Sequence, residues 1–267
     1  MKIRCATRAD KPAVLDFCKD TFSWGDYIAD VWDSWLLEGN LLVIEEKNTV
    51  IALCHLSFSS NTAQVWIEGI RIHPNYRRRG YGTKLVLYAE SLAKKKSCKI
   101  ARMIIESKNK ASLKLANLLG YSLEDKWRLY HLHPKKQSSL TVHAINIKQV
   151  EKFLTSSTYT SSWKWIPLKS DINELIKNKR VLVSLQDGKE LAAGIWNKSE
   201  ISSNVLQLGF INGNKKGMED ILRFMQNRGY ELGSEKIQVF AQEKIHLQMG
   251  GLNKRSLFHL VRKDLHL

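Results

Sequence analysis

Hydrophobic and polar positions in the first third of the chain follow first a helical and then a strand pattern. Apolar side chains recur every three or four residues in segments 11–19 and 28–36, which is the spacing of an amphipathic helix. Three β-rich runs separated by short polar segments come next, at residues 41–45, 49–58 and 63–72. The pattern therefore predicts two helices followed by a three-stranded antiparallel meander.

Beyond residue 72 the pattern alternates between helix and strand. A loop at 74–82 leads into a helix with one apolar face at 83–95, whose lysine-rich end suits the negative end of the helix dipole. Further elements are predicted as a strand at 101–106, a short helix at 111–119 and a strand at 127–132. Residues 134–139 are polar and break both periods. We place a boundary there, between domains 1–134 and 140–267.

The second half of the chain repeats this order of elements. A hairpin, a strand and a helix are predicted at 181–196, 204–212 and 218–228, and closing strands at 236–241 and 257–262. Strands and helices in this order indicate the α+β (mixed α/β) class. We expect the fold to be duplicated, an inference that rests on element order and not on identity.

The composition is that of a globular protein, with 43% hydrophobic and 25% charged residues. No segment has the roughly 18–20 unbroken apolar residues of a membrane helix, and no apolar stretch of signal-peptide type follows the N-terminal charges. We expect a cytoplasmic protein without a membrane partner. The four cysteines have no CxxC spacing, so neither a zinc site nor a redox motif is expected.

The chain is strongly basic. A formal net charge of +16, from 42 Lys and Arg against 26 Asp and Glu, raises the concentration of anions near the surface. Nucleic acid and a polyphosphate cofactor are two such anions. Basic clusters occur at 77–79, 94–96 and 135–136, but no aromatic stacking platform is interleaved with them, as a single-strand binder would need. We therefore do not expect nucleic acid as the main partner.

The sharpest local motif lies between the strand ending near Ile72 and the helix beginning near Thr83. Its sequence is Arg77-Arg78-Arg79-Gly80-Tyr81-Gly82-Thr83. Glycines leave backbone N–H groups free to surround a phosphate at a helix N-terminus, and arginines add charge-assisted contacts. The motif fits neither the P-loop nor the dinucleotide GxGxxG pattern. We interpret it as a pyrophosphate site, with an ordinary solvated basic turn as the alternative.

The residues before this loop strengthen that interpretation. The run Ile67-Glu68-Gly69-Ile70-Arg71-Ile72-His73-Pro74-Asn75-Tyr76, with the loop, resembles the signature strand and (Q/R)xxGx(G/A) loop of the GNAT N-acetyltransferases. Asn109 and Leu118-Leu119-Gly120-Tyr121 resemble that family's next segment, and the resemblance covers about residues 1–133. It implies a central mixed β-sheet flanked by helices. Segment 24–35 is similar to a tandem subgroup with a second GNAT-like domain, which includes histidine-type amino-acid acetyltransferases.

The resemblance implies acetyl-coenzyme A (acetyl-CoA) as cosubstrate and no metal. In the family the signature strand separates from its neighbour, and backbone groups matching Ile70, Arg71 and Ile72 bind the pantetheine arm and polarise the acetyl carbonyl. The loop that binds pyrophosphate matches Arg77, Arg78, Arg79, Gly80, Tyr81, Gly82 and Thr83. Asn109 matches a residue on the pantetheine side.

Glu68 is the candidate general base. An alkylammonium acceptor has a pKa of about 10, so a carboxylate acting directly or through water would help to remove its proton. Many family members carry a glutamate at this place on the signature strand. Strand alternation puts Glu68 on one face with the apolar Trp66 and Ile70. The alternatives are a surface carboxylate and a partner for Arg71.

The family's general acid has no counterpart here. The usual tyrosine lies four residues before the glycine matching Gly120, where this chain has Ala116, and Tyr121 matches a packing aromatic. Trp24 and Tyr27 are candidates for an acceptor pocket, with a helical core stripe as the alternative.

His55, His73 and His131 show neither a visible partner nor metal-ligand spacing, so we assign them no role. In the second half, residues 211–217 lack the arginine-glycine signature, so we expect that copy to bind no coenzyme. The sequence thus predicts transfer of acetyl from acetyl-CoA to a primary amine of a small molecule, amino acid, peptide or protein. The alternatives are a non-catalytic acyl-CoA sensor and a basic nucleic-acid-associated protein.

Overall fold

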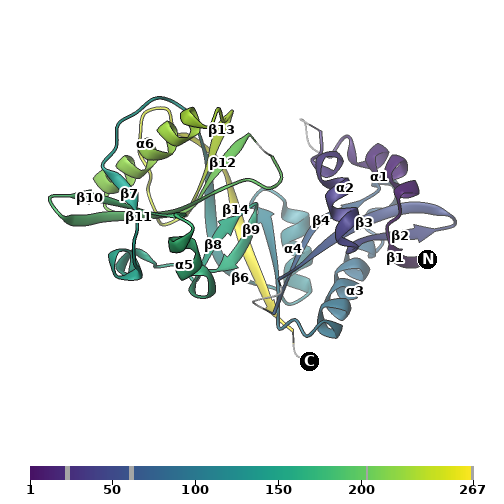
Figure 1. The fold of residues 1–267 in the computed structure, drawn as a ribbon. Helices are drawn as coiled ribbons and strands as arrows, with labels where there is room; N and C mark the ends of the chain where they lie inside the picture. Colours follow the sequence, from purple (N-terminus) through teal and green to yellow (C-terminus); the bar gives the residue numbers. More distant parts are fainter. Residues whose placement is uncertain (22–24, 60–62, 203, 266–267) are drawn as a thin grey trace. The chain divides into compact units, whose positions relative to one another are not determined.

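The chain forms two compact units in the computed structural model, which describes residues 1–21, 25–59, 63–202 and 204–265. The first unit consists of Met1–Glu124 with Val261–Leu267, and the second of Asp125–Leu260 (Figure 1). Among the described residues, no helix is long and apolar enough to pass through a lipid bilayer.

The sheet of the first unit has the strand order β1-β2-β3-β4-β5. The strands are β1 (Lys2–Cys5), β2 (Leu41–Glu46), β3 (Thr49–Ser59), β4 (Gln64–Ile72) and β5 (Ile100–Glu106). Neighbours from β1 to β4 run antiparallel, whereas β4 and β5 run parallel. The predicted meander at 41–72 is confirmed. β1 was not predicted, because four residues are too few for a two-residue period to stand out.

Helices cover both faces of this sheet (Figure 1). They are α1 (Lys11–Cys18), α2 (Ile28–Glu38), α3 (Tyr81–Lys95) and α4 (Lys110–Leu118), with short 3-10 turns at Arg8–Asp10 and Pro74–Tyr76. On one face α1 and α2 pack against Leu41, Val43 and Leu53. On the other, α3 and α4 pack against Leu42 and Ile44, the alternate residues of the same strand.

The sheet of the second unit has the order β14-β6-β13-β12-β11-β10-β7. Its strands include β6 (Ser122–Leu132), β7 (Thr141–His143), β10 (Val181–Gln186), β11 (Lys189–Lys198), β12 (Val205–Gly213), β13 (Lys236–Gln242) and β14 (Asn253–Asp264). A separate hairpin consists of β8 (Thr158–Ser161) and β9 (Lys164–Pro167). The helices are α5 (Leu168–Lys177) and α6 (Lys215–Glu231), and 3-10 turns lie at Ile147–Gln149 and Glu151–Phe153. The hairpin predicted at 181–196 is confirmed, with Asp187 and Gly188 both at positive φ, as a type I′ turn requires.

Both units share one feature of topology. β4 leads through α3 into its parallel neighbour β5, and β12 leads through α6 into its parallel neighbour β13. Antiparallel strands precede this crossover in each unit. The expected α+β class, with mixed sheets flanked by helices, is confirmed.

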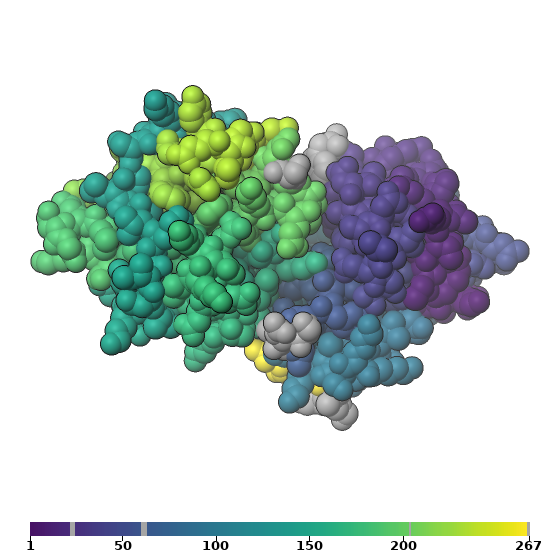
Figure 2. All heavy atoms as spheres, in the orientation of Figure 1, coloured from purple at the N-terminus to yellow at the C-terminus, as the bar shows by residue number. Residues whose placement is uncertain are grey.

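The division between the units differs from the boundary placed at 134–140. The strand expected to close the first domain, β6, belongs to the second unit from Asp125 onward and pairs there with β13. The end of β14 belongs to the first unit, although it was expected in the second domain. Its residues Val261 and Leu265 are buried in the core of the first unit. Figure 2 shows yellow atoms of this C-terminal end beside blue atoms of that unit. Alternation identifies a strand but does not specify which sheet it joins.

Candidate active site in the first unit

Strands β4 and β5 pair at their start and then separate. Their parallel register consists of the pairs Gln64–Ile100, Val65–Ala101 and Trp66–Arg102. β4 continues to Ile72 and β5 to Glu106, and no further pair joins them in the part of the chain that the structure describes. From Ile67 to Ile72, β4 therefore runs without a ladder pair to β5. The candidate backbone groups of Ile70 and Arg71 lie within this stretch.

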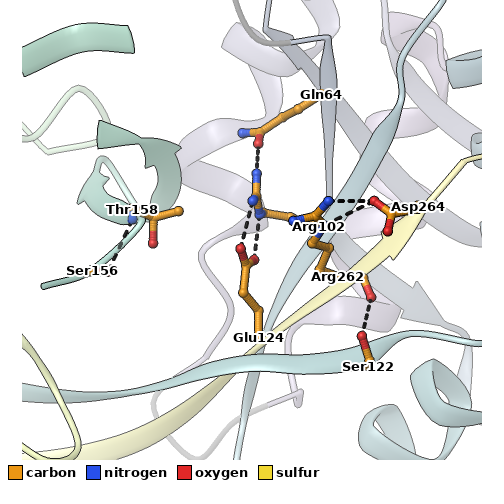
Figure 3. A network of polar contacts seen from close by, with 8 residues as sticks. All are labelled: Gln64, Arg102, Ser122, Glu124, Ser156, Thr158, Arg262 and Asp264. Carbon is orange, nitrogen blue, oxygen red and sulfur yellow. Dashed lines mark hydrogen bonds and ion pairs between the residues drawn. The ribbon is translucent and has the colours of Figure 1, made fainter. Parts of the chain in front are cut away.

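A buried polar network holds the paired end of the two strands (Figure 3). Arg102 of β5 is 3% exposed and donates to the two carboxylate oxygens of Glu124, at 2.7 Å from Nε and 2.8 Å from Nη2. It also donates to Gln64 of β4. The starts of β4 and β5 are thereby tied together before the strands diverge.

The loop after β4 carries exposed arginines to the beginning of α3. Arg77 Nε donates to the carbonyl of Ile72 at 3.2 Å, and the Arg79 guanidinium lies 5.4 Å from the centre of the Tyr76 ring. Arg78 has a φ of 62° and Gly80 a φ of 80°. These left-handed conformations turn the chain into the helix, and glycine adopts them without strain.

The start of α3 fits a phosphate-bearing group. Gly80 is the N-cap and has no side chain to cap the helix, and the first backbone bond of the helix runs from Lys84 N–H to the Gly80 carbonyl at 3.0 Å. The N–H groups of Tyr81, Gly82 and Thr83 precede that bond. A Cβ on Gly80 would meet no atom within 4 Å. Open space, donors, the helix dipole and arginines together suit a phosphate or pyrophosphate group.

Two predicted cofactor residues have structural partners for their side chains. The Tyr81 ring is buried in the core, and its hydroxyl donates to Glu46. Tyr81 therefore offers the loop its backbone N–H and not its phenol. Asn109 is the N-cap of α4 and accepts a hydrogen bond from Ser112 N–H at 3.0 Å. Any contact of Asn109 with a cosubstrate has to coexist with this cap.

Arg71 projects toward the segment that precedes α2. Its guanidinium forms a two-point ion pair with Asp26, at 2.6 Å from Nε and 3.0 Å from Nη2, and lies 5.2 Å from the centre of the Tyr27 ring. Burial raises the pKa of the Tyr27 phenol. Tyr27, a predicted acceptor residue, also packs edge-on against Trp35. Trp24, the other predicted acceptor residue, lies outside the described residues.

A β-bulge at Gly69 shapes the middle of β4. The register of β4 with β3 shifts between Leu53 and His55, where Gly69 has a φ of 64°. A Cβ at Gly69 would lie 2.5 Å from Cζ3 of Trp35, which is itself buried. The bulge therefore requires glycine both for its backbone and for the space that Trp35 occupies.

Glu68 contacts His55, the residue opposite it on β3. Glu68 Oε1 lies 3.0 Å from His55 Nδ1, and the Glu68 side chain is 13% exposed. On the other side of the ring, Glu38 Oε2 lies 3.2 Å from His55 Nε2, at ion-pair distance although without hydrogen-bond geometry. This partner of His55 is not visible along the sequence, because it lies on a neighbouring strand. The pairing of 49–58 with 63–72 was the signal that could have identified it.

The place of the family's proton donor holds no hydroxyl group. Ala116 is buried in the core between α4 and the sheet. Tyr121 is also buried, and burial together with the charge of Glu90 raises the pKa of its phenol. Lys263 Nζ lies 2.7 Å from Glu90. Tyr121 is thus part of the core, in keeping with the packing role given to its counterpart.

The corresponding region of the second unit differs at two places. Asn214 caps α6 with its own side chain, which accepts from Gly217 N–H at 2.8 Å, whereas α3 begins at a bare glycine. At Gly209 a Cβ would overlap the carbonyl oxygen of Thr160, so the backbone of β8 lies directly against β12. The start of α6 therefore differs from the start of α3, because its first turn is capped by a side chain.

The second unit contains a cavity of about 320 Å³, which is lined by His131, Leu132, His133, Lys236, Asn253, Lys254 and Arg255. Burial and the nearby charges of Arg255 and Lys236 lower the pKa of His131 to about 4. No group of three or more His, Cys, Asp or Glu side chains that could hold a metal ion is found within the described ranges.

Comparisons with known proteins agree with these features. The family described as Acetyltransferase (GNAT) matches residues 11–121. A histidine N-acetyltransferase of Scomber australasicus is 29% identical over 98 residues, which are 36% of this chain and 29% of that protein. An N-acetyltransferase 9-like protein of Schizosaccharomyces pombe is 33% identical over 135 residues, 47% of this chain and 61% of that protein. The chain thus matches less than two thirds of the length of either relative.

Solved structures extend the likeness of fold to the whole chain. A GCN5-related N-acetyltransferase from Sphaerobacter thermophilus has a TM-score of 0.65 at 12% identity, over 100% of this chain and 96% of that one. A tandem GNAT protein from the clavulanic acid biosynthesis pathway has a TM-score of 0.59 at 12% identity, over 100% and 99%. The family match covers the segment that carries the separated strands and the arginine-glycine loop. Residues 11–121 of the chain thus match the GNAT family of acetyltransferases, and the whole chain shares its fold with solved members.

Proposed function

We propose that the chain transfers an acetyl group from acetyl-CoA to a primary amine. The observation that carries the proposal is the separation of β4 from β5 beside the uncapped start of α3. An extended strand edge next to an anion site suits a long molecule with a pyrophosphate at one end and a hydrogen-bonding arm at the other.

Acetyl-CoA would supply the activated acetyl thioester. The N–H groups at the start of α3 and the arginines of the loop would hold its pyrophosphate. The backbone of Ile70, Arg71 and Ile72 would pair with the pantetheine arm, and an N–H group of this edge would stabilise negative charge that develops on the carbonyl oxygen.

Glu68 would accept the proton that the acceptor ammonium must lose before it can attack. Glu68 comes directly before the bulge at Gly69 and two residues before Ile70 along β4. Ala116 has no group that could protonate the departing thiolate. A thiol has a pKa of about 8.5, so water is an adequate proton source for it.

We infer that the acceptor is a small amine or an amino acid. The relative named histidine N-acetyltransferase supports this class. The predicted acceptor residue Tyr27 lies beside an acidic side chain, Asp26, which Arg71 neutralises. This surrounding suits a small acceptor that carries both an amine and a polar group better than a polycation.

Calorimetric titration with acetyl-CoA tests the binding site. Gly80→Asp places a negative side chain in the space beside the α3 N-terminus, and affinity should fall at least about tenfold because the carboxylate competes with and repels the phosphates. Gly188→Asp is the matched control, since Gly188 also has a positive φ and open space around it. Equal affinity of the wild type and both variants would refute the proposed cosubstrate site.

Turnover is tested by thiol release from acetyl-CoA over a panel of amines that includes histidine. Glu68→Gln should lower kcat by about 100-fold or more and leave acetyl-CoA affinity unchanged, because general-base catalysis contributes about 10²–10⁴-fold. Binding without turnover of any amine would instead identify a non-catalytic acyl-CoA sensor, which the absence of a hydroxyl group at Ala116 allows.

A further inference from the structure

His55 is a completely buried imidazole with an aromatic ring on one face. It is 0% exposed, and its ring stacks on Trp35 at 4.3 Å between centroids and 7° between planes. A polar ring in such surroundings costs free energy unless its nitrogen atoms have partners. Its position in the interior of β3 therefore needs an explanation beyond packing.

The partners of His55 are carboxylates on both sides. Glu68 lies 3.0 Å from Nδ1, and Glu38, whose side chain is 40% exposed, lies 3.2 Å from Nε2. In the tautomer that carries its proton on Nδ1, His55 donates a hydrogen bond to the Glu68 carboxylate. One oxygen of Glu68 is thereby held by a buried donor.

The fold holds this donor in one orientation. Gly69 lacks a side chain, which allows Trp35 to approach β4, and Trp35 in turn stacks on the His55 ring. The β3–β4 register puts His55 directly opposite Glu68. Helix α2 thus fixes the imidazole, and the imidazole fixes the carboxylate.

The titratable and charged groups that face this pair come from several elements: Glu38 of α2, Asp26 and Tyr27 before α2, Arg71 of β4 and Cys54 of β3. Arg71 is engaged by Asp26 in a two-point ion pair. Glu68 contacts His55, and Arg71 pairs with Asp26.

We propose that His55 is a positioning residue for the acceptor-deprotonating carboxylate, with Trp35 stacked on its ring and Glu38 at ion-pair distance from Nε2. The inference rests on the proposed acetyltransferase function. His55 touches neither acetyl-CoA nor the amine in this role. Its Nδ1–H holds Glu68 Oε1, so that the carboxylate meets the ammonium in one orientation.

Two substitutions at His55 separate this role from packing. His55→Phe keeps a stacking ring but removes the donor, whereas His55→Asn removes the ring but offers an amide N–H near the place of Nδ1. In the amine assay, His55→Phe should lower kcat by about 10- to 100-fold, as misplacement of a reacting group does. His55→Asn should retain more of kcat, and acetyl-CoA affinity should be unchanged in both.

The pH profile is the readout that packing alone would not move. In His55→Phe the acid limb of kcat/KM should shift to higher pH, because the ionised carboxylate loses a hydrogen bond that favours it. His143→Phe is a control in the second unit, where His143 packs edge-on against Phe224, and its profile should match the wild type. Thermal unfolding of each variant confirms that it folds. If His55→Phe does not fold, Glu38→Gln replaces it, with a smaller expected shift of the acid limb of kcat/KM.

The outcomes distinguish the two proposals. A wild type that binds acetyl-CoA but turns over no amine overturns the proposed function and this role with it. Turnover with the same pH profile in wild type, His55→Phe and Glu38→Gln overturns the role of His55 alone. A shifted acid limb in His55→Phe, with partial recovery in His55→Asn, supports it.

Discussion

At the residue scale, the site depends on a glycine that makes room for a tryptophan. Gly69 has a φ of 64°, and a Cβ there would lie 2.5 Å from Trp35 Cζ3. We expect Gly69→Ala to lower the free energy of unfolding by about 2–5 kcal/mol, because a left-handed backbone conformation and overpacking each add a cost. Urea unfolding of the purified variant measures this loss.

Gly39→Ala is the matched control for that prediction. Gly39 ends α2 with a φ of 73°, but a Cβ there would meet no atom within 4 Å. Gly39→Ala should lower the free energy of unfolding by about 1–2 kcal/mol, which is the cost of the left-handed backbone conformation alone. Equal losses in the two variants would show that contact between Gly69 and Trp35 is unimportant for stability.

At the element scale, the separation of β4 and β5 depends on a fixed point at their start. Arg102 and Glu124 are joined there by two hydrogen bonds inside the protein. Arg102→Met should lower the free energy of unfolding by about 3–5 kcal/mol, because it leaves the Glu124 carboxylate largely buried without its partner. Chemical denaturation of the variant and of the wild type gives the difference.

A second pair in the same view is the control for Arg102 (Figure 3). Arg262 and Asp264 form an exposed ion pair, so Arg262→Met should change the free energy of unfolding by less than about 1 kcal/mol. A double variant that also carries Glu124→Leu should recover part of the Arg102→Met loss. No recovery would mean that the cost comes from lost packing and not from an unpaired charge.

At the scale of the whole molecule, the first unit is completed by the end of the chain. Val261 and Leu265 lie in its core, and Lys263 pairs with the buried Glu90. A fragment of residues 1–134 should therefore unfold at lower temperature than the intact chain, because it exposes this core and leaves Glu90 unpaired. Circular dichroism and calorimetric binding of acetyl-CoA compare the two.

Supplying the missing strand provides the control. A synthetic peptide of residues 257–267 added to the fragment should raise its unfolding temperature, whereas a peptide with Val261, Lys263 and Leu265 replaced by serine should not. A fragment that is as stable as the intact chain without any peptide would show that the C-terminal strand is dispensable for the first unit.

The sequence by itself determined the elements that have a clear local period. The helices at 11–19 and 28–36 and the meander at 41–72 follow from side-chain spacing, which depends only on neighbours along the chain. The arginine-glycine loop was recognisable for the same reason, since a phosphate site at a helix start is built from consecutive residues. Strands β7–β9 were missed because three or four residues define no period, whereas α5 was missed although its ten residues have a helical period.

Only the tertiary structure decided the contacts between distant residues. His55 and Glu68 meet because β3 and β4 pair in one register around the bulge at Gly69, and spacing along the chain does not fix that register. The assignment of β6 and of the end of β14 to their units was also not predictable, because alternation shows that one face of a strand is buried but not which strands it pairs with. The arginine-glycine loop was therefore specified locally by the chain, whereas the surroundings of the candidate base were decided by the packing of α2, β3 and β4.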